Sequence, residues 1–254
     1  MDGVLADMDG ALARIAEQEF GVKTKIAFPD EDAAAGKLAV DQVSPRGHAH
    51  EAPDKVPGKA AAKPSDDRPA GYDTAVLANL NARQQSRLWK RVRGTRNFWE
   101  TLEECEPGAV RHIQKLAHHQ RWDVLFVTQR PSTAGRTTQL QTQHWLRLHG
   151  FEYPAVYTTI GSRGAIAKAL TLDAHIDDRL QICVDVATES KTWPILVWRD
   201  ADSFDRIQAG ARNLGIAVVT TVAEALNRIE EADRGAAALA DQPTLLDRLR
   251  RAFK

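Results

Sequence analysis

The chain has 254 residues, 43% hydrophobic and 27% charged, which excludes a collagen-like or wholly disordered chain and suits one good-sized core with an accessory element. Lys plus Arg and Asp plus Glu both number 34, so net charge argues neither for nor against a polyanionic partner. The two cysteines, Cys105 and Cys183, match no metal-ligand spacing, so the expected compartment is a reducing cytoplasm. Apolar runs fall short of the roughly 18 residues that span a bilayer and no signal peptide is visible, so we expect no membrane partner.

The first twelve residues carry the strongest chemical pattern. The motif Met-Asp-Gly-(Val/Ala)-Leu occurs there twice, seven residues apart, and brings Asp2, Asp7 and Asp9 close together in the sequence. Carboxylates beside a glycine suit a divalent cation, which takes oxygen ligands, and an aspartate can attack phosphorus to form an aspartyl-phosphate. The simpler interpretation of an isolated Asp-x-Asp-Gly is an acidic turn or a helix N-cap, and the motifs further along the chain favour the chemical one.

Two registers of this motif remain open. In the first, residues 4–6 end a strand, Asp7 is both the nucleophile and a metal ligand, and Asp9 is the acid/base. In the second, Asp2 is the acid/base and the nucleophile lies one residue before Met1, so that the chain begins inside its own catalytic motif.

Helical periodicity distinguishes the two registers. Apolar residues recur at helical spacing from Ala6 to Phe20, with Asp7 as a plausible N-cap and Gly21 as a C-terminal stop. The first register instead requires a central strand at Gly3–Ala6 and a helix that begins only near Leu12. We favour the second register, which predicts one continuous helix.

Two segments interrupt the core. Residues 29–71 are rich in proline and alanine and lack apolar periodicity, so we expect a disordered insertion whose deletion leaves folding and catalysis intact. Residues 72–105 return to helical patterning with a basic face. Such a face is usually just solvated. The functional interpretation is a cap whose cations meet an anionic substrate, and nucleic acid is the least favoured partner.

Helical and strand patterns alternate from residue 107 onward, which predicts an α/β fold with a doubly wound parallel sheet and ligands at the carboxyl ends of the strands. A charged helical tail follows from residue 223, with an Ala-rich break at residues 235–240. The strands are expected at 123–128, 155–159, 174–177, 195–198 and 216–220, and the helices at about 109–119, 137–149, 164–170 and 205–214.

Polar residues follow two of these strands. Thr128 and Gln129 come after the first strand, where a hydroxyl and backbone N–H groups can hold phosphoryl oxygens, although a threonine in that position is most often a simple cap. Asp177 and Asp178 close another strand. Adjacent acids repel one another unless a cation offsets them, so this pair predicts a metal site. A basic residue between the two motifs, Arg163 or Lys168, could offset the crowded charge.

Taken in order, these motifs resemble those of the haloacid-dehalogenase-like (HAD) phosphohydrolases, and in detail they look most like the 5′-deoxynucleotidase branch. The resemblance covers residues 1–28 and about 97–200. It implies a HAD-like Rossmannoid core at 1–28 and 106–222, a small helical cap at 72–105 and a tail at 223–254. The residues that carry the branch likeness are Phe98-Trp99, Pro107-Gly108, Thr128 with Arg130-Pro131, Trp145-Leu146, His149-Gly150 and Ile176-Asp177-Asp178-Arg179.

The resemblance also implies roles for individual residues. Asp177 and Asp178 match a pair that supplies a Mg²⁺ ligand, and Thr128 matches a phosphate-binding threonine. Asp2, or Asp9 in the other register, matches the acid/base. We expect the aspartate after Met1 or Met8 to converge with Asp177 and Asp178 on one metal ion.

Two of the matches are imperfect. Arg163 stands where the family's lysine usually opens a helix, and Lys168 has the right chemistry but a mid-helix position. Gln129 stands where the deoxynucleotidase pattern more often has a small residue.

The resemblance therefore implies a Mg²⁺-dependent phosphomonoester hydrolase that acts through an aspartyl-phosphate on a small phosphorylated substrate, such as a (deoxy)nucleotide monophosphate. Two alternatives stay open. One is a phosphatase for another small metabolite or for a nucleic-acid end. The other is a HAD-like domain that binds a ligand without turnover, which a missing nucleophile would favour.

Overall fold

The structure is a computed structural model that describes residues 1–23 and 75–240. The expected insertion at residues 29–71 and the end of the tail, residues 241–254, lie outside the described residues. Within the described ranges, none of the helices has the length and apolar character needed to cross a membrane. The helices are α1 (Met8–Phe20), α3 (Ala75–Ala78), α4 (Ala82–Gly94), η1 (Phe98–Glu100), α5 (Ala109–Gln120), α6 (Thr138–Leu148), α7 (Arg163–Leu170), α8 (Leu180–Glu189), α9 (Phe204–Arg212) and α10 (Val222–Ala240), and the strands are β1 (Leu125–Thr128), β2 (Ala155–Thr158), β3 (Ala174–Asp177), β4 (Trp193–Val197) and β5 (Ala217–Val219).

The strands form two small parallel sheets, which confirms an α/β fold with parallel strands. β1 pairs with β2, and β3, β4 and β5 form the second sheet in that order. One continuous doubly wound sheet was expected, but the described residues contain no strand that joins β1 to β3. Each of these two strands therefore keeps one edge without a strand partner in the described part of the chain.

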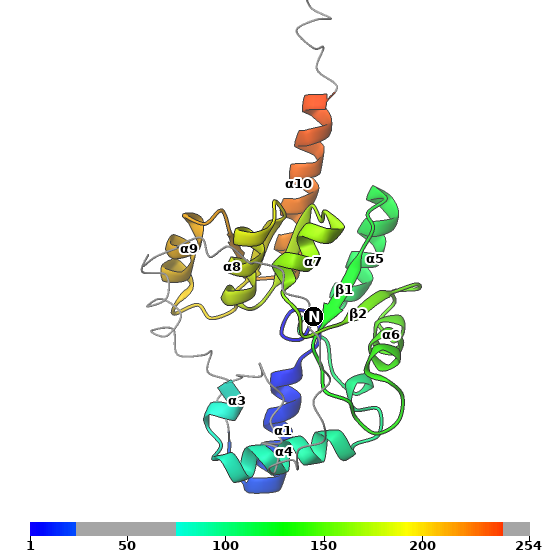
Figure 1. The fold of residues 1–254 in the computed structure, drawn as a ribbon, viewed down its shortest axis with the longest axis vertical. Helices are drawn as coiled ribbons and strands as arrows, with labels where there is room; N and C mark the ends of the chain where they lie inside the picture. The colour runs from blue at the N-terminus through cyan, green and yellow to red at the C-terminus, as the bar shows by residue number, and fades with distance from the viewer. Residues whose placement is uncertain (24–74, 241–254) are drawn as a thin grey trace, which may run out of the picture.

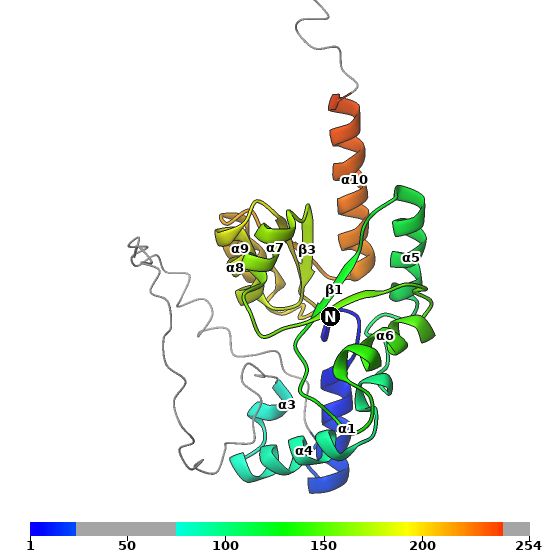
Figure 2. The ribbon, with the colours of Figure 1, turned by 45° about the vertical axis from the view of Figure 1, so that its right-hand side comes forward.

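Helices cover each sheet and form a separate layer at one end (Figures 1 and 2). α6 packs on β2, whereas α8 and α9 pack on β3, β4 and β5. α1 contacts α3 and α4, and these three helices lie together at the end of the molecule opposite to α10. The N-terminus lies between the two sheets and this helical layer.

Capping explains the bounds of α1. The Asp7 carboxylate accepts a hydrogen bond of 2.8 Å from the N–H of Gly10, which satisfies one of the free donors of the first turn. A Cβ at position 10 would overlap this carboxylate, so only glycine fits there. The helix ends at Gly21, whose φ of 66° is left-handed and whose N–H donates to the carbonyl of Glu17.

The N-terminal helix contradicts the first register. That register required a strand at Gly3–Ala6, but these residues form a turn, with isolated bridges at its ends. It also placed the start of the helix near Leu12, whereas α1 begins at Met8. The second register predicted a helix from Ala6, which is two residues too early, and correctly made Asp7 the N-cap.

The other elements depart from the sequence prediction at two places. α8 was not predicted, although it buries Leu180, Cys183 and Val186 at helical spacing. The expected Ala-rich break at residues 235–240 is wrong, since α10 continues through it to Ala240. Alanine is the strongest helix former, so a single glycine does not end this helix.

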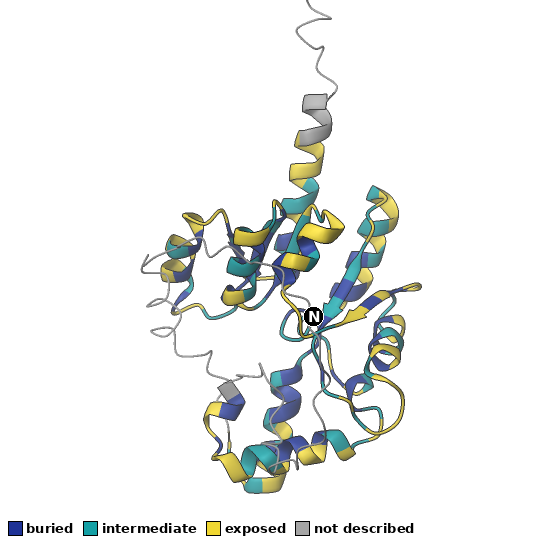
Figure 3. Cartoon of the chain, in the orientation of Figure 1, coloured by how far each residue is buried: buried dark blue, intermediate teal, exposed yellow. Residues whose placement is uncertain are grey.

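Two apolar clusters make up the core, and Figure 3 shows the buried residues along the strands and the inward sides of the helices. The larger cluster joins the N-terminal turn, α1 and α4 to β1, β2 and β4, and its largest fully buried side chains are Trp89, Trp99 and Trp145. The smaller one lies among β4, β5, α8 and α9. The N-terminal turn is thus packed in the main core, with Val4, Leu5 and Ala6 all buried.

Candidate functional site at the carboxyl ends of β1 and β3

The site is built around a tight turn at the start of the chain. The N–H of Gly3 donates to the carbonyl of Ala6 at 3.0 Å, and the N–H of Leu5 donates to the carbonyl of Met1 at 2.9 Å. Gly3 has a φ of 72°, in the left-handed region that favours glycine. The guanidinium of Arg199, just after β4, donates to the carbonyl of Gly3 at 2.6 Å and thereby anchors the turn to the second sheet.

The Asp2 carboxylate faces the end of β1. It accepts a hydrogen bond of 3.0 Å from the hydroxyl of Thr128, and it accepts from the Nε of Arg130 at 2.9 and 3.0 Å. The Nη2 of Arg130 donates to the same carboxylate, which makes this a two-pronged ion pair. Its side chains are almost fully enclosed, with exposed fractions of 0% for Arg130 and 13% for Asp2.

Thr142 and Trp99 hold the guanidinium of Arg130 in place. Its Nη1 donates to the hydroxyl of Thr142 on α6 at 3.0 Å. Its guanidinium lies over the ring of Trp99, 5.0 Å from the ring centroid, in a cation–π contact. The indole Nε1 of Trp99 donates in turn to the carbonyl of Pro131 at 3.0 Å.

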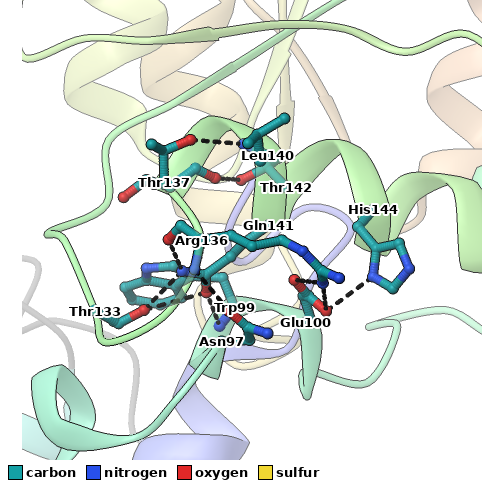
Figure 4. A network of polar contacts seen from close by, with 11 residues as sticks. Asn97, Trp99, Glu100, Thr133, Arg136, Thr137, Leu140, Gln141, Thr142 and His144 are labelled. Atoms are coloured by element: carbon teal, nitrogen blue, oxygen red, sulfur yellow. Dashed lines mark hydrogen bonds and ion pairs between the residues drawn. The ribbon is translucent and has the colours of Figure 1, made fainter.

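A buried polar network continues from Trp99 into the loop after β1 (Figure 4). Gln141 of α6 is fully buried; its side-chain oxygen accepts from the N–H of Trp99 at 3.1 Å, and its Nε2 donates to the carbonyl of Arg136 at 2.6 Å. Thr133 exchanges hydrogen bonds with the same amide. At the edge of the network, Glu100 pairs with Arg136 and with His144.

The second acidic group lies at the end of β3. A Cβ on Gly3 would overlap the carboxylate of Asp178, so this side chain is close against the N-terminal turn. Burial first, and then the charge of Asp177, raise the pKa of Asp178 to about 8. Burial opposes ionisation of Asp177 as well, but the imidazole of His175, 3.5 Å from the carboxylate, and the N–H of Arg179, which donates to it at 3.0 Å, lower the pKa of Asp177.

The two aspartates that follow the turn lie at the start of α1. Asp7 is the N-cap of α1, and Asp9 lies in the first turn of that helix. Burial, followed by the charges of Asp7 and Asp2, raises the pKa of Asp9 to about 6. One carboxylate oxygen of Asp9 is buried without a hydrogen-bond partner. Asp7 is committed to the helix cap, so its expected role as nucleophile and metal ligand has no support in this geometry.

The predicted phosphate-binding residues fall into two groups. Thr128 reaches the site, although its hydroxyl is engaged by Asp2, and Gln129 follows it as a half-buried residue. Arg163 is the first residue of α7 and is 8% exposed, and its Nη1 donates to the carbonyl of Gly161. Lys168 lies on the exposed side of the same helix. Of the two basic candidates, Arg163 is therefore the buried one.

The expected three-carboxylate metal centre is not seen in this arrangement. The turn places Asp2 and Gly3 between the ends of β1 and β3, but the Asp2 carboxylate is turned toward Arg130. Among the described residues, no three His, Cys, Asp or Glu side chains are placed to hold a metal ion. The donor set still suits Mg²⁺, which commonly takes one or two carboxylates together with water and phosphate oxygens, because the buried Asp177 and the half-buried Asp178 are adjacent and crowded.

Sequence reasoning missed three charged residues of this site. Arg130 was noted only as part of a motif, and Arg199 and Glu106 were not singled out. Glu106 accepts from Arg199 at 2.5 Å and from the N–H of Val222, so it joins the turn to the start of α10. A charged residue that directly follows an apolar strand was the available signal for Arg199.

Comparison of the chain with family models, curated proteins and solved structures gives no match.

Proposed function

We propose that this protein hydrolyses phosphomonoesters through an aspartyl-phosphate intermediate, with Asp2 as the acid/base. One observation carries the proposal: Asp2 and Gly3 lie between Thr128 at the end of β1 and Asp178 at the end of β3. Parallel α/β sheets bind ligands at the carboxyl ends of their strands, and the three residue types are those that the resemblance to HAD phosphohydrolases implies.

In this proposal the attacking carboxylate belongs to an aspartate directly before Met1 in a longer chain. Among the described strands, β1 and β3 each have one edge without a strand partner, which supports this idea because a parallel strand between them would end beside Asp2. Asp7 is the alternative nucleophile, and its engagement as the N-cap of α1 argues against it.

The chemistry divides into two displacements at phosphorus. In the first, the aspartate oxygen forms a bond to phosphorus, the ester oxygen leaves, and Asp2 gives that oxygen a proton. In the second, water attacks the phosphorus, Asp2 takes a proton from the water, and the aspartate is released together with inorganic phosphate. Mg²⁺, held by Asp178 with Asp177 beside it, would offset the negative charge of the phosphate when bound.

The remaining residues would bind and orient the substrate. Backbone N–H groups after β1 and the buried cation of Arg163 are the candidates for contacts to phosphoryl oxygens. We propose a small phosphorylated metabolite as substrate, such as a (deoxy)nucleotide monophosphate, and the helices α3 and α4, within residues 72–105, as its cap.

The first experiment is a phosphatase screen on the protein translated from the whole reading frame, including any residues encoded upstream of Met1, with and without Mg²⁺. We expect Mg²⁺-dependent release of phosphate from at least one small phosphomonoester. A well-folded protein that binds such esters without releasing phosphate would instead support a binding domain.

Substitutions then assign the roles. Asp2→Asn should lower kcat/KM for an alkyl phosphate by about 100-fold or more through the loss of the proton donor, whereas Asp7→Asn should retain most activity. Asp123→Asn is the matched control, because Asp123 is exposed and lies before β1. Activity that survives Asp2→Asn but disappears with Asp7→Asn would overturn this assignment.

A further inference from the structure

The ion pair between Asp2 and Arg130 is unusual in how completely it uses the arginine. All three guanidinium nitrogens are engaged: Nε and Nη2 donate to the Asp2 carboxylate, and Nη1 donates to Thr142. The side chain is fully enclosed, with Trp99 against its face. An arginine that binds a substrate phosphate must present nitrogens to the ligand, and this one presents them to a side chain of its own protein.

A purely structural ion pair is a weak explanation for this arrangement. Burying two charges costs desolvation energy that their attraction often only just offsets, and apolar residues of similar volume frequently serve as well. The pair also lies at the end of β1, directly beside the N-terminal turn, and not in the interior of either core cluster. Gln141 accepts from the N–H of Trp99 and joins it to two further residues, Thr133 and Arg136.

We propose that Arg130 is the positioning residue of Asp2: it fixes the carboxylate at the end of β1, where Asp2 would transfer protons in the proposed reaction. The inference rests on the proposed function. Thr128 holds the same carboxylate from a second direction, and Trp99 and Thr142 hold the guanidinium in place. Arg130 acts through Asp2 and does not itself contact the substrate.

The test compares two substrates that differ in their need for a proton donor. An alkyl phosphate has a poor leaving group and needs a proton from Asp2, whereas an aryl phosphate with an acidic phenol does not. Arg130→Gln should lower kcat/KM for the alkyl ester by about 100-fold or more, and for the aryl ester by less than about 10-fold, since general acid catalysis contributes roughly 10²–10⁴-fold. Arg130→Lys should recover part of the loss, because it keeps the charge but not the two-pronged geometry.

A double variant separates positioning from substrate binding. If Arg130 acts through Asp2, then Asp2→Asn combined with Arg130→Gln should be no slower than Asp2→Asn alone. Arg228→Gln is the control for removing an arginine, because Arg228 pairs only with Glu224 on α10 among the contacts described, away from the site.

The outcomes distinguish this inference from the proposed function. A wild-type protein without phosphatase activity overturns both. An active wild type in which the two substitutions multiply, or in which Arg130→Gln slows both esters equally and raises KM, overturns the positioning role alone and assigns Arg130 to phosphate binding.

Discussion

The two copies of the Met-Asp-Gly motif adopt different structures, and the difference comes from their neighbours. Around Gly3 the chain turns in the left-handed region and brings Asp2 against Thr128 and Arg130. Around Gly10 the same residues continue a helix, because Asp7 caps it. Asp2 therefore gains three hydrogen-bond donors, whereas Asp9 is left with a buried oxygen that has none. The same Met-Asp-Gly sequence thus gives a candidate catalytic carboxylate at Asp2 and, at Asp9, a carboxylate with one buried oxygen that lacks a hydrogen-bond partner.

The raised pKa of Asp9 predicts a pH-dependent cost to stability. The unfolded chain ionises this group from about pH 4, but the folded chain keeps the proton up to about pH 6, so stability falls as the pH rises through this window. Asp9→Asn removes the penalty and should raise the melting temperature at pH 7, by an amount worth about 1 to 3 kcal/mol. Thermal unfolding from pH 3.5 to 8 checks it, as the two proteins should converge below about pH 4.

The N-cap role of Asp7 gives a second prediction. Asp7→Ala removes the acceptor of the Gly10 N–H and should lower the free energy of unfolding by about 1 kcal/mol, measured by urea denaturation. Asp7→Ser keeps a capping oxygen and should cost only a fraction of that. Equal losses in the two variants would show that the cap is not what Asp7 contributes.

At the scale of the element, one buried side chain joins the loop after β1 to both α6 and η1. Gln141 of α6 bonds to the backbone of Trp99 on one side and of Arg136 on the other. α6 and η1 also contact Arg130, through Thr142 and Trp99 respectively. The rigidity of the candidate site depends on a glutamine that lies outside it.

Replacing Gln141 should lower the free energy of unfolding. Gln141→Leu fills a similar volume but leaves the buried N–H of Trp99 without its acceptor, at about 1 to 3 kcal/mol, and it also removes the hydrogen bond to the carbonyl of the exposed Arg136. Gln143→Leu is the matched control on the same helix, since Gln143 makes one long bond of 3.4 Å to Pro154. Chemical denaturation should show that Gln141→Leu loses more stability than Gln143→Leu. Similar losses for both variants would show that the Gln141 hydrogen bonds do not account for the effect.

Elements were predictable where the local pattern decides them. Apolar strands such as β1, at residues 125–128, and the capped helix α1 follow from their apolar residues and from their flanking residues. The Asp2–Arg130 pair could not be predicted, because nothing local shows that residue 130 turns back to residue 2. α8 was missed because its apolar repeat covers only three buried residues and because it directly follows Asp177-Asp178, a pair that was interpreted as a metal site. A pattern in the sequence reveals a residue type and its element, but not its distant partner.

At the scale of the molecule, the separation of the two sheets has a measurable signature. β4 is the one described strand with partners on both sides. Its amides should exchange with solvent more slowly than those of β1 and β3, each of which has one open edge. Hydrogen exchange on residues 1–254 tests this order. In the longer protein that we propose, a strand between β1 and β3 should slow the amides of both to the rate of β4, and unchanged rates would argue against such a strand.

The turn at the start of the chain has partners only far along it. Asp2 bonds to Thr128, which lies 126 residues later in the sequence, and Gly3 bonds to Arg199, which lies 196 residues later. During synthesis at roughly 5 to 20 residues per second, the ribosome takes about 10 to 40 s to deliver that last partner. For this interval the acidic turn has emerged but has no fixed geometry. A nascent chain released before residue 199 would thus carry the sequence of the candidate site without its shape, and phosphatase activity would report that translation has run past β4.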